Sequence, residues 1–201
     1  MSDRPWGIPG ISGHAYDARF AALARAGQDV HGEVNFVAAL GVSSVLDAGC
    51  GTGRVAIELA RRGCEVVGID RDPEFMRMAR QKAPHLTWCE ADLATVTLTT
   101  PAQEVRLFDA IVLAGNVMIF LDAGTEQTVM ANLARHLAPG GFLVSGFQLH
   151  QPGKITLAAY DTYATRAGLT LVERWATWER APWHPTSDYA VSIHRRHHPA
   201  V

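Results

Sequence analysis

The sequence predicts an α/β protein built on a doubly wound, mostly parallel sheet, and three observations carry this prediction. Between residues 44 and 147, short apolar runs alternate with segments of helical periodicity, which is the pattern of β-α-β units. A glycine-rich turn at 49–53 directly follows the first apolar run. The length of 201 residues, with 48% hydrophobic and 19% charged residues, fits one globular domain with a single core.

The alternating pattern places the elements of this region. We expect strands near 44–48, 65–70, 86–90, 108–114 and 141–147, and helices near 54–62, 73–82 and 125–138. Gly63 closes the first helix, and Asp72 followed by Pro73 caps the start of the second. The run Pro139-Gly140-Gly141 is a stop signal between the third helix and the fifth strand.

The two ends of the chain complete the prediction. We expect helices near 16–25, 31–40 and 155–167, strands near 169–179 and 188–195, an extended arm over 1–13, and a solvated basic tail over 194–198. Tyr16 and Phe20 are four positions apart in the first helix, so they can anchor it to the core. Tyr16 is equally a candidate for contact with a ligand.

The turn after the first strand has the residue types of a nucleoside-binding loop. Asp47 ends the strand, and glycines at 49, 51 and 53 allow a sharp turn and close approach of a ligand to the main chain. A dinucleotide motif needs glycine where Arg54 stands. Asp47 would repel a pyrophosphate but attract the ammonium group of an amino acid. The loop therefore favours a cationic ligand over a nicotinamide dinucleotide.

These residues resemble the first motif, acid-x-G-x-G-x-G, of class I S-adenosylmethionine-dependent methyltransferases. The matching positions are Asp47, Gly49, Gly51 and Gly53, with Cys50 as a small residue inside the turn. The resemblance implies a Rossmann-like seven-stranded sheet, mostly parallel with an antiparallel C-terminal hairpin, and helices on both faces. It also implies lid helices within residues 1–41, a methyltransferase domain over 42–198, S-adenosylmethionine as cofactor and S-adenosylhomocysteine as product.

Two further acids follow the second and third expected strands, as they do in this family. Asp70, with Arg71 beside it, stands 17 residues after Gly53, where the resemblance implies a contact with the ribose hydroxyls. Asp92, followed by Leu93, stands where the family contacts the adenine amino group. Both acids could instead cap the next helix, although the cap at 72–73 leaves Asp70 free for another role.

The segment after the fourth strand bears on the substrate. Asn116 lies in the family motif beside the transferable methyl group, but Val117 and Met118 replace the Pro-Pro that marks enzymes acting on nucleobase amines. The net charge of -2, with scattered basic residues, gives no face for nucleic acid. We therefore expect a small-molecule substrate.

A general base is optional for methyl transfer, because the sulfonium carbon is already activated. Four histidines fall in expected loops, and of these His31, His150 and His184 are our candidates for base or acceptor positioning; His14 is the fourth. A structural or surface role is the alternative for each.

The tryptophans, the cysteines and the N-terminal residues argue against an aromatic cage, a metal site and a membrane location. Trp175 and Trp178 are three positions apart, so on a regular strand they face opposite sides and cannot form one aromatic cage; Trp183 is left as a substrate contact. Three cysteines without ligand spacing predict neither zinc nor disulfides, and no other metal set is found. The N-terminus lacks a signal peptide and no stretch could span a bilayer, so we expect a cytoplasmic protein.

The sequence therefore predicts an S-adenosylmethionine-dependent methyltransferase that acts on a small molecule. The alternative is a non-catalytic protein that binds S-adenosylmethionine or S-adenosylhomocysteine as a sensor or partner subunit. A third reading, a nicotinamide-dependent reductase, is disfavoured by Asp47 and Arg54.

Overall fold

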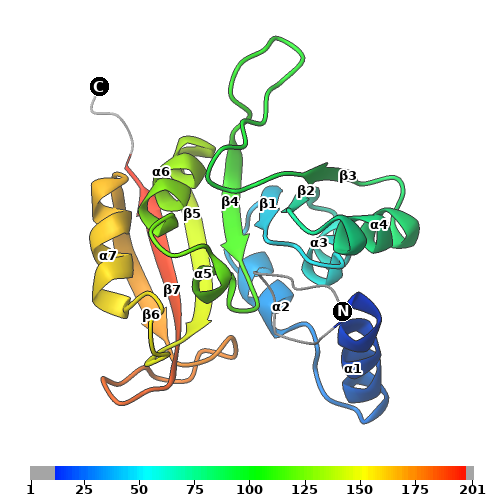
Figure 1. The fold of residues 1–201 in the computed structure, drawn as a ribbon, viewed down its shortest axis with the longest axis horizontal. Coiled ribbons are helices and arrows are strands. Elements are labelled where there is room, and N and C mark those ends of the chain that lie inside the picture. The colour runs from blue at the N-terminus through cyan, green and yellow to red at the C-terminus, as the bar shows by residue number, and fades with distance from the viewer. Residues whose placement is uncertain (1–11, 198–201) are drawn as a thin grey trace.

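The computed structural model describes residues 12–197, which form one sheet flanked by helices (Figure 1). The strands are β1 (Ser44–Ala48), β2 (Glu65–Asp70), β3 (Thr87–Glu90), β4 (Phe108–Leu113), β5 (Leu137–Gln148), β6 (Leu169–Trp175) and β7 (Tyr189–Arg196). The helices are α1 (Gly13–Arg25), α2 (Gly32–Ala38), α3 (Arg54–Arg61), α4 (Pro73–Lys82), α5 (Val117–Phe120), α6 (Glu126–Arg135) and α7 (Leu157–Arg166).

The seven strands lie in the order β3-β2-β1-β4-β5-β7-β6. Strands β1 to β5 pair in parallel, and β7 pairs antiparallel with both β5 and β6. This confirms the predicted doubly wound sheet with its antiparallel C-terminal hairpin. The chain order reverses between β1 and β4, which is where open α/β sheets bind ligands, outside the carboxyl ends of the strands.

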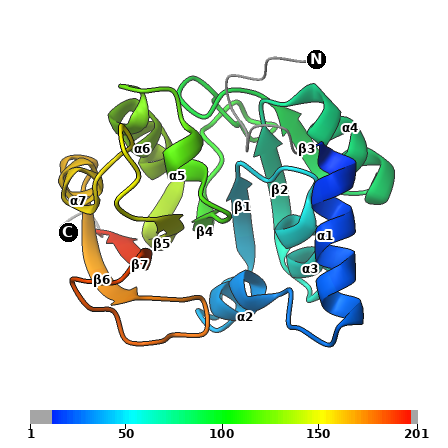
Figure 2. The ribbon, with the colours of Figure 1, turned by 60° about the horizontal axis from the view of Figure 1, so that its bottom comes forward.

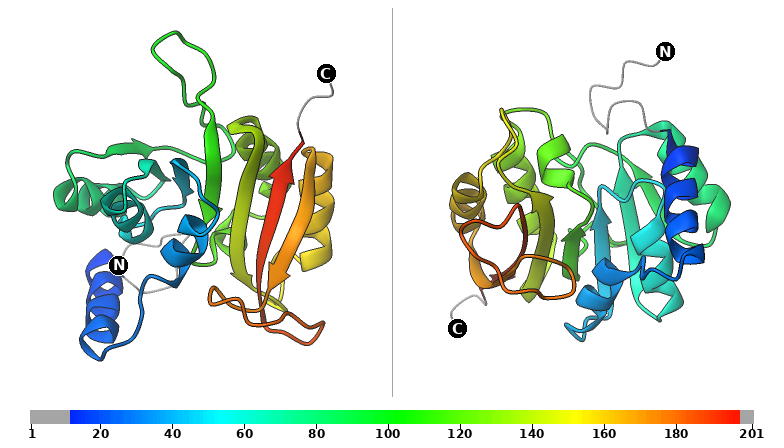
Figure 3. Two further views of the ribbon diagram at one scale, coloured as in Figure 1. Left: turned by 180° about the vertical axis from the view of Figure 1, so that it is seen from behind. Right: turned by 90° about the horizontal axis from the view of Figure 1, so that it is seen from below.

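Two hydrophobic clusters cover the two faces of the sheet, because alternate residues of each buried strand point to opposite sides. In β1, Val45 belongs to the cluster shared with α2 and α3, whereas Leu46 belongs to the cluster shared with α5, α6 and α7. Figure 3 shows from behind how α7 lies along β6 and β7. Helix α1 stands outside these layers and packs on α4 (Figure 2).

The predicted stop signal before the fifth strand is wrong. Helix α6 already ends at Arg135, and β5 begins at Leu137, so the Pro-Gly-Gly run at 139–141 lies inside a strand. A shift in register between Phe108 and Ala110 of β4 accommodates it. Gly141 is needed there, because an added Cβ would lie 2.9 Å from the carbonyl oxygens of Ala138 and Asp109.

Three further expectations at the ends of the chain need correction. Strand β6 ends at Trp175, so Trp178 lies in the connection, and both indoles pack on one hydrophobic cluster rather than on opposite faces. His194 is 1% exposed within β7, so residues 194–196 are strand and not a solvated tail. His14 lies in the first turn of α1 and not in a loop. Of the expected arm, residues 1–11 lie outside the described residues.

Helix α1 comes very close to α4. An added Cβ at Gly13 would lie 2.5 Å from the sulfur of Met78, so the first residue of α1 has no room for a side chain. Within residues 12–197, the helices are too short or too polar to cross a bilayer.

Candidate functional site

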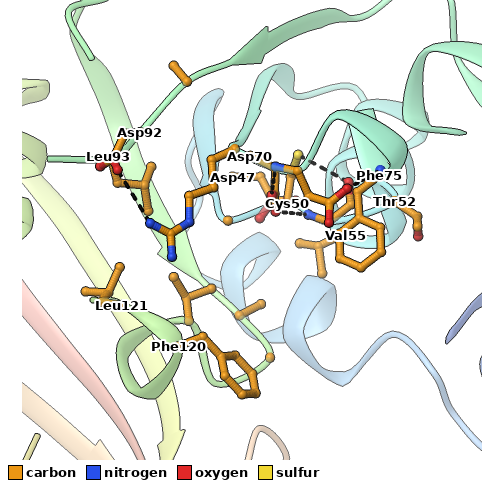
Figure 4. A pocket seen from close by; sticks show the side chains of 18 of the residues that line it. Asp47, Cys50, Thr52, Val55, Asp70, Phe75, Asp92, Leu93, Phe120 and Leu121 are labelled. Carbon is orange, nitrogen blue, oxygen red and sulfur yellow. Dashed lines mark hydrogen bonds and ion pairs between the residues drawn. The ribbon is translucent and has the colours of Figure 1, made fainter. Parts of the chain in front are cut away.

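A pocket opens at the carboxyl ends of β1, β2 and β4, at the predicted reversal of the sheet (Figure 4). Most of the predicted cofactor residues line it, namely Tyr16, Asp47, Gly49, Cys50, Gly51, Asp70, Arg71, Asp92 and Leu93. Gly53 and Asn116 stand next in sequence to lining residues but do not line it themselves. The sheet thus brings together residues that the sequence spreads over more than 70 positions.

Asp47 is a buried carboxylate at the base of the pocket. It is 1% exposed, and one of its oxygens accepts a hydrogen bond from the Ala56 backbone N–H at 3.0 Å. Burial raises the pKa of Asp47 to about 7, against the opposing effects of this hydrogen bond and of the Arg54 charge. A ligand cation beside Asp47 would compensate the cost of this buried charge.

The glycine loop runs in backbone conformations that other residues rarely adopt. Gly49, Gly51 and Gly53 have φ of 78°, 54° and 86°. An added Cβ at Gly49 would clash with Val117 at 2.6 Å, whereas at Gly51 its nearest neighbour would be Phe75 at 3.9 Å. Gly51 therefore leaves an open side of the loop that a ligand can approach.

Trp88 of β3 explains the third glycine of the loop. An added Cβ at Gly53 would lie 2.6 Å from the indole ring, and one at Gly68 of β2 would lie 2.4 Å from the same ring. The indole N–H donates to the Ala83 carbonyl at 2.8 Å, which fixes the ring in place. Gly53 thus supports the loop from behind through packing.

Asp70 connects the end of β2 to the glycine loop. One oxygen accepts from the Gly51 N–H at 2.8 Å and the other from the Asp72 N–H at 2.9 Å. Burial raises the pKa of Asp70, while these backbone hydrogen bonds lower it. Asp72 caps α4 as predicted, by accepting from the backbone N–H groups of residues 74 and 75. Asp70 does not cap this helix and keeps lone pairs for ligand hydroxyls.

Asp92 and Arg71 form the far wall of the pocket together with Asp122. The Arg71 guanidinium holds Asp122 through two hydrogen bonds of 2.7 and 3.0 Å and lies 3.6 Å from Asp92. Asp92 also accepts from the Ala94 N–H at 2.7 Å, which stabilises the turn after β3. Its side chain is 45% exposed, so the second oxygen remains accessible. The capping alternative is therefore partly realised, in a turn instead of a helix.

Asn116 shapes the wall beyond β4. It has φ of 72°, and its side-chain oxygen accepts from the Gln148 N–H at 2.7 Å. The amide is thus used to join the ends of β4 and β5. The neighbouring residues Gly115, Val117 and Phe120 line the pocket and make this wall largely apolar.

Arg54 is a lining residue to which sequence reasoning gave no role. Its guanidinium donates to both oxygens of Glu33, at 2.5 and 3.0 Å, and to the Val30 carbonyl at 2.6 Å. Its charge also acts on the nearby Tyr16 hydroxyl, and the guanidinium lies 4.1 Å over the ring of Phe20. Burial raises the pKa of Tyr16. Tyr16 contacts Phe20 within α1, at 4.8 Å between ring centroids, and it also lines the pocket. Neither ring belongs to the two hydrophobic clusters of the core.

The three candidate histidines lie away from the lining of this pocket. His31 precedes α2, and its backbone N–H donates to Asp29. His150 is exposed in the loop after β5 and lines a second cavity with Trp183 and Arg174. His184 is exposed in the connection between β6 and β7. No group of three potential metal ligands is found within residues 12–197.

The charges of the pocket favour a cation. Five aspartates line it, at positions 47, 70, 72, 92 and 122, against two arginines, at 54 and 71. Both arginines are already paired with carboxylates. A ligand carrying a pyrophosphate would meet an excess of negative charge here, in agreement with the expectation from Asp47 and Arg54.

Known methyltransferases share this architecture. The model of a methyltransferase domain family matches residues 45–141. The crystal structure of a TehB-like SAM-dependent methyltransferase from Corynebacterium glutamicum superposes with a TM-score of 0.81 at 32% identity, over 92% of this chain and 97% of that chain. The CcbJ methyltransferase of Streptomyces caelestis shares the fold, with a TM-score of 0.74 at 24% identity over 83% of this chain and 89% of its own.

Curated relatives match over shorter segments. A trans-aconitate 2-methyltransferase of Azoarcus is 38% identical over 103 residues, which are 50% of this chain and 37% of that protein. A demethylmenaquinone methyltransferase of Tropheryma whipplei is 34% identical over 58% of this chain and 48% of its own length. The matched segment thus spans less than half of either relative. Together with the fold, the pocket and the nearly full-length structural match, these similarities show that the chain belongs to the class I S-adenosylmethionine-dependent methyltransferases.

Proposed function

We propose that this protein binds S-adenosylmethionine in the pocket at the sheet reversal and transfers its methyl group to a small molecule. The observation that carries the proposal is the position of Asp47, Asp70 and Asp92 at three neighbouring strand ends, around a loop that Gly51 leaves open on one side. These groups match a ligand with an ammonium group, a ribose and an adenine in one line.

The residues present fit this cofactor. Asp47 would hold the ammonium group, directly or through water, and Asp70 would accept the ribose hydroxyls. Asp92 and Leu93 would flank the adenine, with Arg71 held beside it by Asp122. Gly51 supports the fit, because the space beside its Cα that a Cβ would fill faces Phe75 only at 3.9 Å.

The bound cofactor supplies a methyl group on a positively charged sulfur, which any aligned nucleophile can attack. The tasks left to the protein are to orient the acceptor and exclude water. Tyr16 and Phe20 lie on α1, and Glu33 on α2 holds Arg54 at the pocket, so we propose that these helices form the lid. The methyltransferase domain expected over residues 42–198 would then be the catalytic body.

The acceptor side of the pocket offers little acid-base chemistry. Gly115, Val117 and Phe120 are apolar, and the pocket lining within residues 12–197 includes no histidine and no lysine. The raised pKa of Tyr16 makes it a poor base. We therefore propose an acceptor that reacts without help from a protein base, such as a thiolate or a neutral amine, and the three histidines have no part in this step.

The distribution of charge on the protein supports a small molecule as the methyl acceptor. The basic residues are scattered, and the pocket lining is acidic, which suits neither the backbone of nucleic acid nor its approach. Two of the similar proteins named above carry small-molecule names, trans-aconitate and demethylmenaquinone. These names describe those proteins.

Calorimetric titration of the full chain with S-adenosylmethionine, S-adenosylhomocysteine and NADH tests the binding step. We expect binding of the first two compounds and none of NADH. The transfer step is then tested with radiolabelled S-adenosylmethionine and a panel of thiols, amines and alcohols. Binding without transfer to any acceptor class would favour the non-catalytic alternative, and binding of NADH alone would overturn the proposal.

A further inference from the structure

Arg54 follows the glycine loop directly and begins α3, yet its side chain turns toward the N-terminal helices. Its side chain is 11% exposed, and it lines the cofactor pocket. Burying a guanidinium is costly unless it is paired and hydrogen-bonded. The contacts of Arg54 therefore show what this buried cation does.

Every direct contact of the guanidinium leads to the predicted lid. Glu33 on α2 takes both terminal nitrogens, the Val30 carbonyl takes one of them, and the Phe20 ring of α1 stacks at 4.1 Å. Tyr16, on the same helix as Phe20, lines the pocket beside Arg54. The Arg54 side chain thus connects the start of α3 to α1, to α2 and to the segment between these two helices.

The same side chain acts on the base of the pocket. The charged and titratable groups that bear on Asp47 are Arg54 from α3, Asp70 from β2, Glu33 from α2 and Tyr16 from α1. Of these, Arg54 is a cation that favours the ionised carboxylate, whereas Asp70 and Glu33 are anions that disfavour it. Because a cationic ligand group needs the ionised form, the balance between Arg54 and Glu33 bears on binding.

We propose that Arg54 is a positioning residue for the methionine end of the cofactor, acting through Asp47 and through the lid helices that its side chain holds at the pocket. Its two terminal nitrogens donate to Glu33 and Val30, which fixes the guanidinium between the lid and the pocket, whereas its buried Nε has no partner within the described residues. Removing Arg54 would release Tyr16, leave Glu33 unpaired and make Asp47 harder to ionise. This inference rests on the proposed binding of the cofactor.

The test measures the affinity of the full chain for S-adenosylhomocysteine by calorimetry across a range of pH. For the unchanged protein, we expect affinity to rise with pH and to level off as Asp47 ionises, at about pH 7. In Arg54→Met, we expect at least a tenfold loss of affinity and a midpoint about one pH unit higher. Arg54→Lys keeps the charge, so it should show a smaller loss of affinity and a smaller shift of the midpoint than Arg54→Met.

Two further variants separate this role from damage to the fold. Glu33→Gln breaks the same ion pair but leaves the cation near Asp47, so its midpoint should move down by about half a pH unit, opposite to Arg54→Met. Arg62→Met is the matched control, because Arg62 lies at the end of α3 and also contacts α2, through Asn35 at 2.8 Å. It should change neither affinity nor midpoint.

The outcomes distinguish this inference from the proposed function. If the unchanged protein does not bind S-adenosylhomocysteine, the proposed function fails. If it binds, but Arg54→Met and Glu33→Gln shift the midpoint in the same direction or not at all, Arg54 has only a structural role. Circular dichroism confirms that each variant compared is folded.

Discussion

The two halves of the sheet edge around the pocket are built in different ways. On the side of β1, β2 and β3, each strand ends in or beside an aspartate, and backbone groups of the glycine loop complete the wall. On the side of β4 and β5, the wall beside the strand ends is apolar, with Val117 and Phe120, and the side chain of Asn116 serves the sheet itself. Asp122, which follows on this side, is held by Arg71. The first half can recognise a defined ligand through its carboxylates and backbone groups. The second half can select a ligand only by the shape of an apolar surface.

The largest effect is expected from filling the open side of the glycine loop. Gly51→Leu should weaken binding of S-adenosylhomocysteine on the order of 100-fold or more, because the side chain would enter the pocket. Gly63→Leu is the control, since Gly63 also has a positive φ, of 94°, with no neighbour within 4 Å of an added Cβ, and lies outside the pocket lining. Equal losses of affinity in both variants would show that backbone strain, and not a side chain entering the pocket, is responsible.

A smaller loss is expected from neutralising the base of the pocket. Asp47→Asn keeps an oxygen that can accept from the Ala56 N–H but removes the charge. Charge-assisted hydrogen bonds contribute about 1.5–3 kcal/mol, so affinity for S-adenosylmethionine should fall roughly 10- to 100-fold. Calorimetry at about pH 8 measures this. Unchanged affinity would mean that the ammonium group lies elsewhere.

The same variant should stabilise the cofactor-free protein. The pKa of Asp47 is about 7 in the folded state, above its unfolded value of about 4. The stability that the neutral acid contributes is therefore complete below about pH 4 and is lost as pH rises to about 7. The advantage of Asp47→Asn in free energy of unfolding should grow by about 3 kcal/mol between about pH 5 and pH 8. Urea unfolding at both pH values checks this, and a constant difference would contradict it.

The sequence could predict the first half of the site because its signals are local. Asp47, the glycines, Asp70 and Asp92 each follow an apolar run directly, and parallel strands bring their carboxyl ends together. Arg54 could not be assigned a role in this way, since its partners Val30 and Glu33 lie 24 and 21 positions away. Its position within the motif gave no sign of which elements it would reach.

The strands could also be predicted from local sequence signals. The errors in the prediction arose where contacts between distant parts of the chain decide the structure. The Pro-Gly-Gly run at 139–141 would end a strand in isolation, but a shift in register against β4 lets β5 continue through it, with the extra residues in β5. His194 stands in a basic run, yet β7 carries it beneath α7, where its ring lies 5.3 Å from Tyr160. Burial of this kind depends on the partner element, which sequence pattern does not show.

The apolar half should respond differently to mutation. Phe120→Ala should leave the affinity for S-adenosylhomocysteine within about threefold, because it removes no charged or hydrogen-bonding group, while changing which acceptors are methylated. Leu107→Ala, at a residue that is 45% exposed and does not line the pocket, is the control. A large loss of cofactor affinity in Phe120→Ala would place the aromatic ring against the cofactor instead.

A modest loss of cofactor affinity is expected at Asp92. Its side chain is 45% exposed, so Asp92→Asn should weaken S-adenosylhomocysteine binding only about two- to fivefold. Asparagine retains an oxygen for the Ala94 N–H, so the turn should persist. Comparison with S-inosylhomocysteine, which lacks the adenine amino group, sharpens the assignment. If the variant loses affinity equally for both compounds, Asp92 does not contact that amino group.

Trp88 places a native fluorophore behind the cofactor loop. Because the indole packs against both Gly53 and Gly68, any movement of the loop on ligand binding changes the surroundings of the ring. Intrinsic emission can therefore report occupancy without a label, with Trp88→Phe separating its signal from that of the other tryptophans. The residue that shapes the loop from behind is thus also a means to follow it in solution.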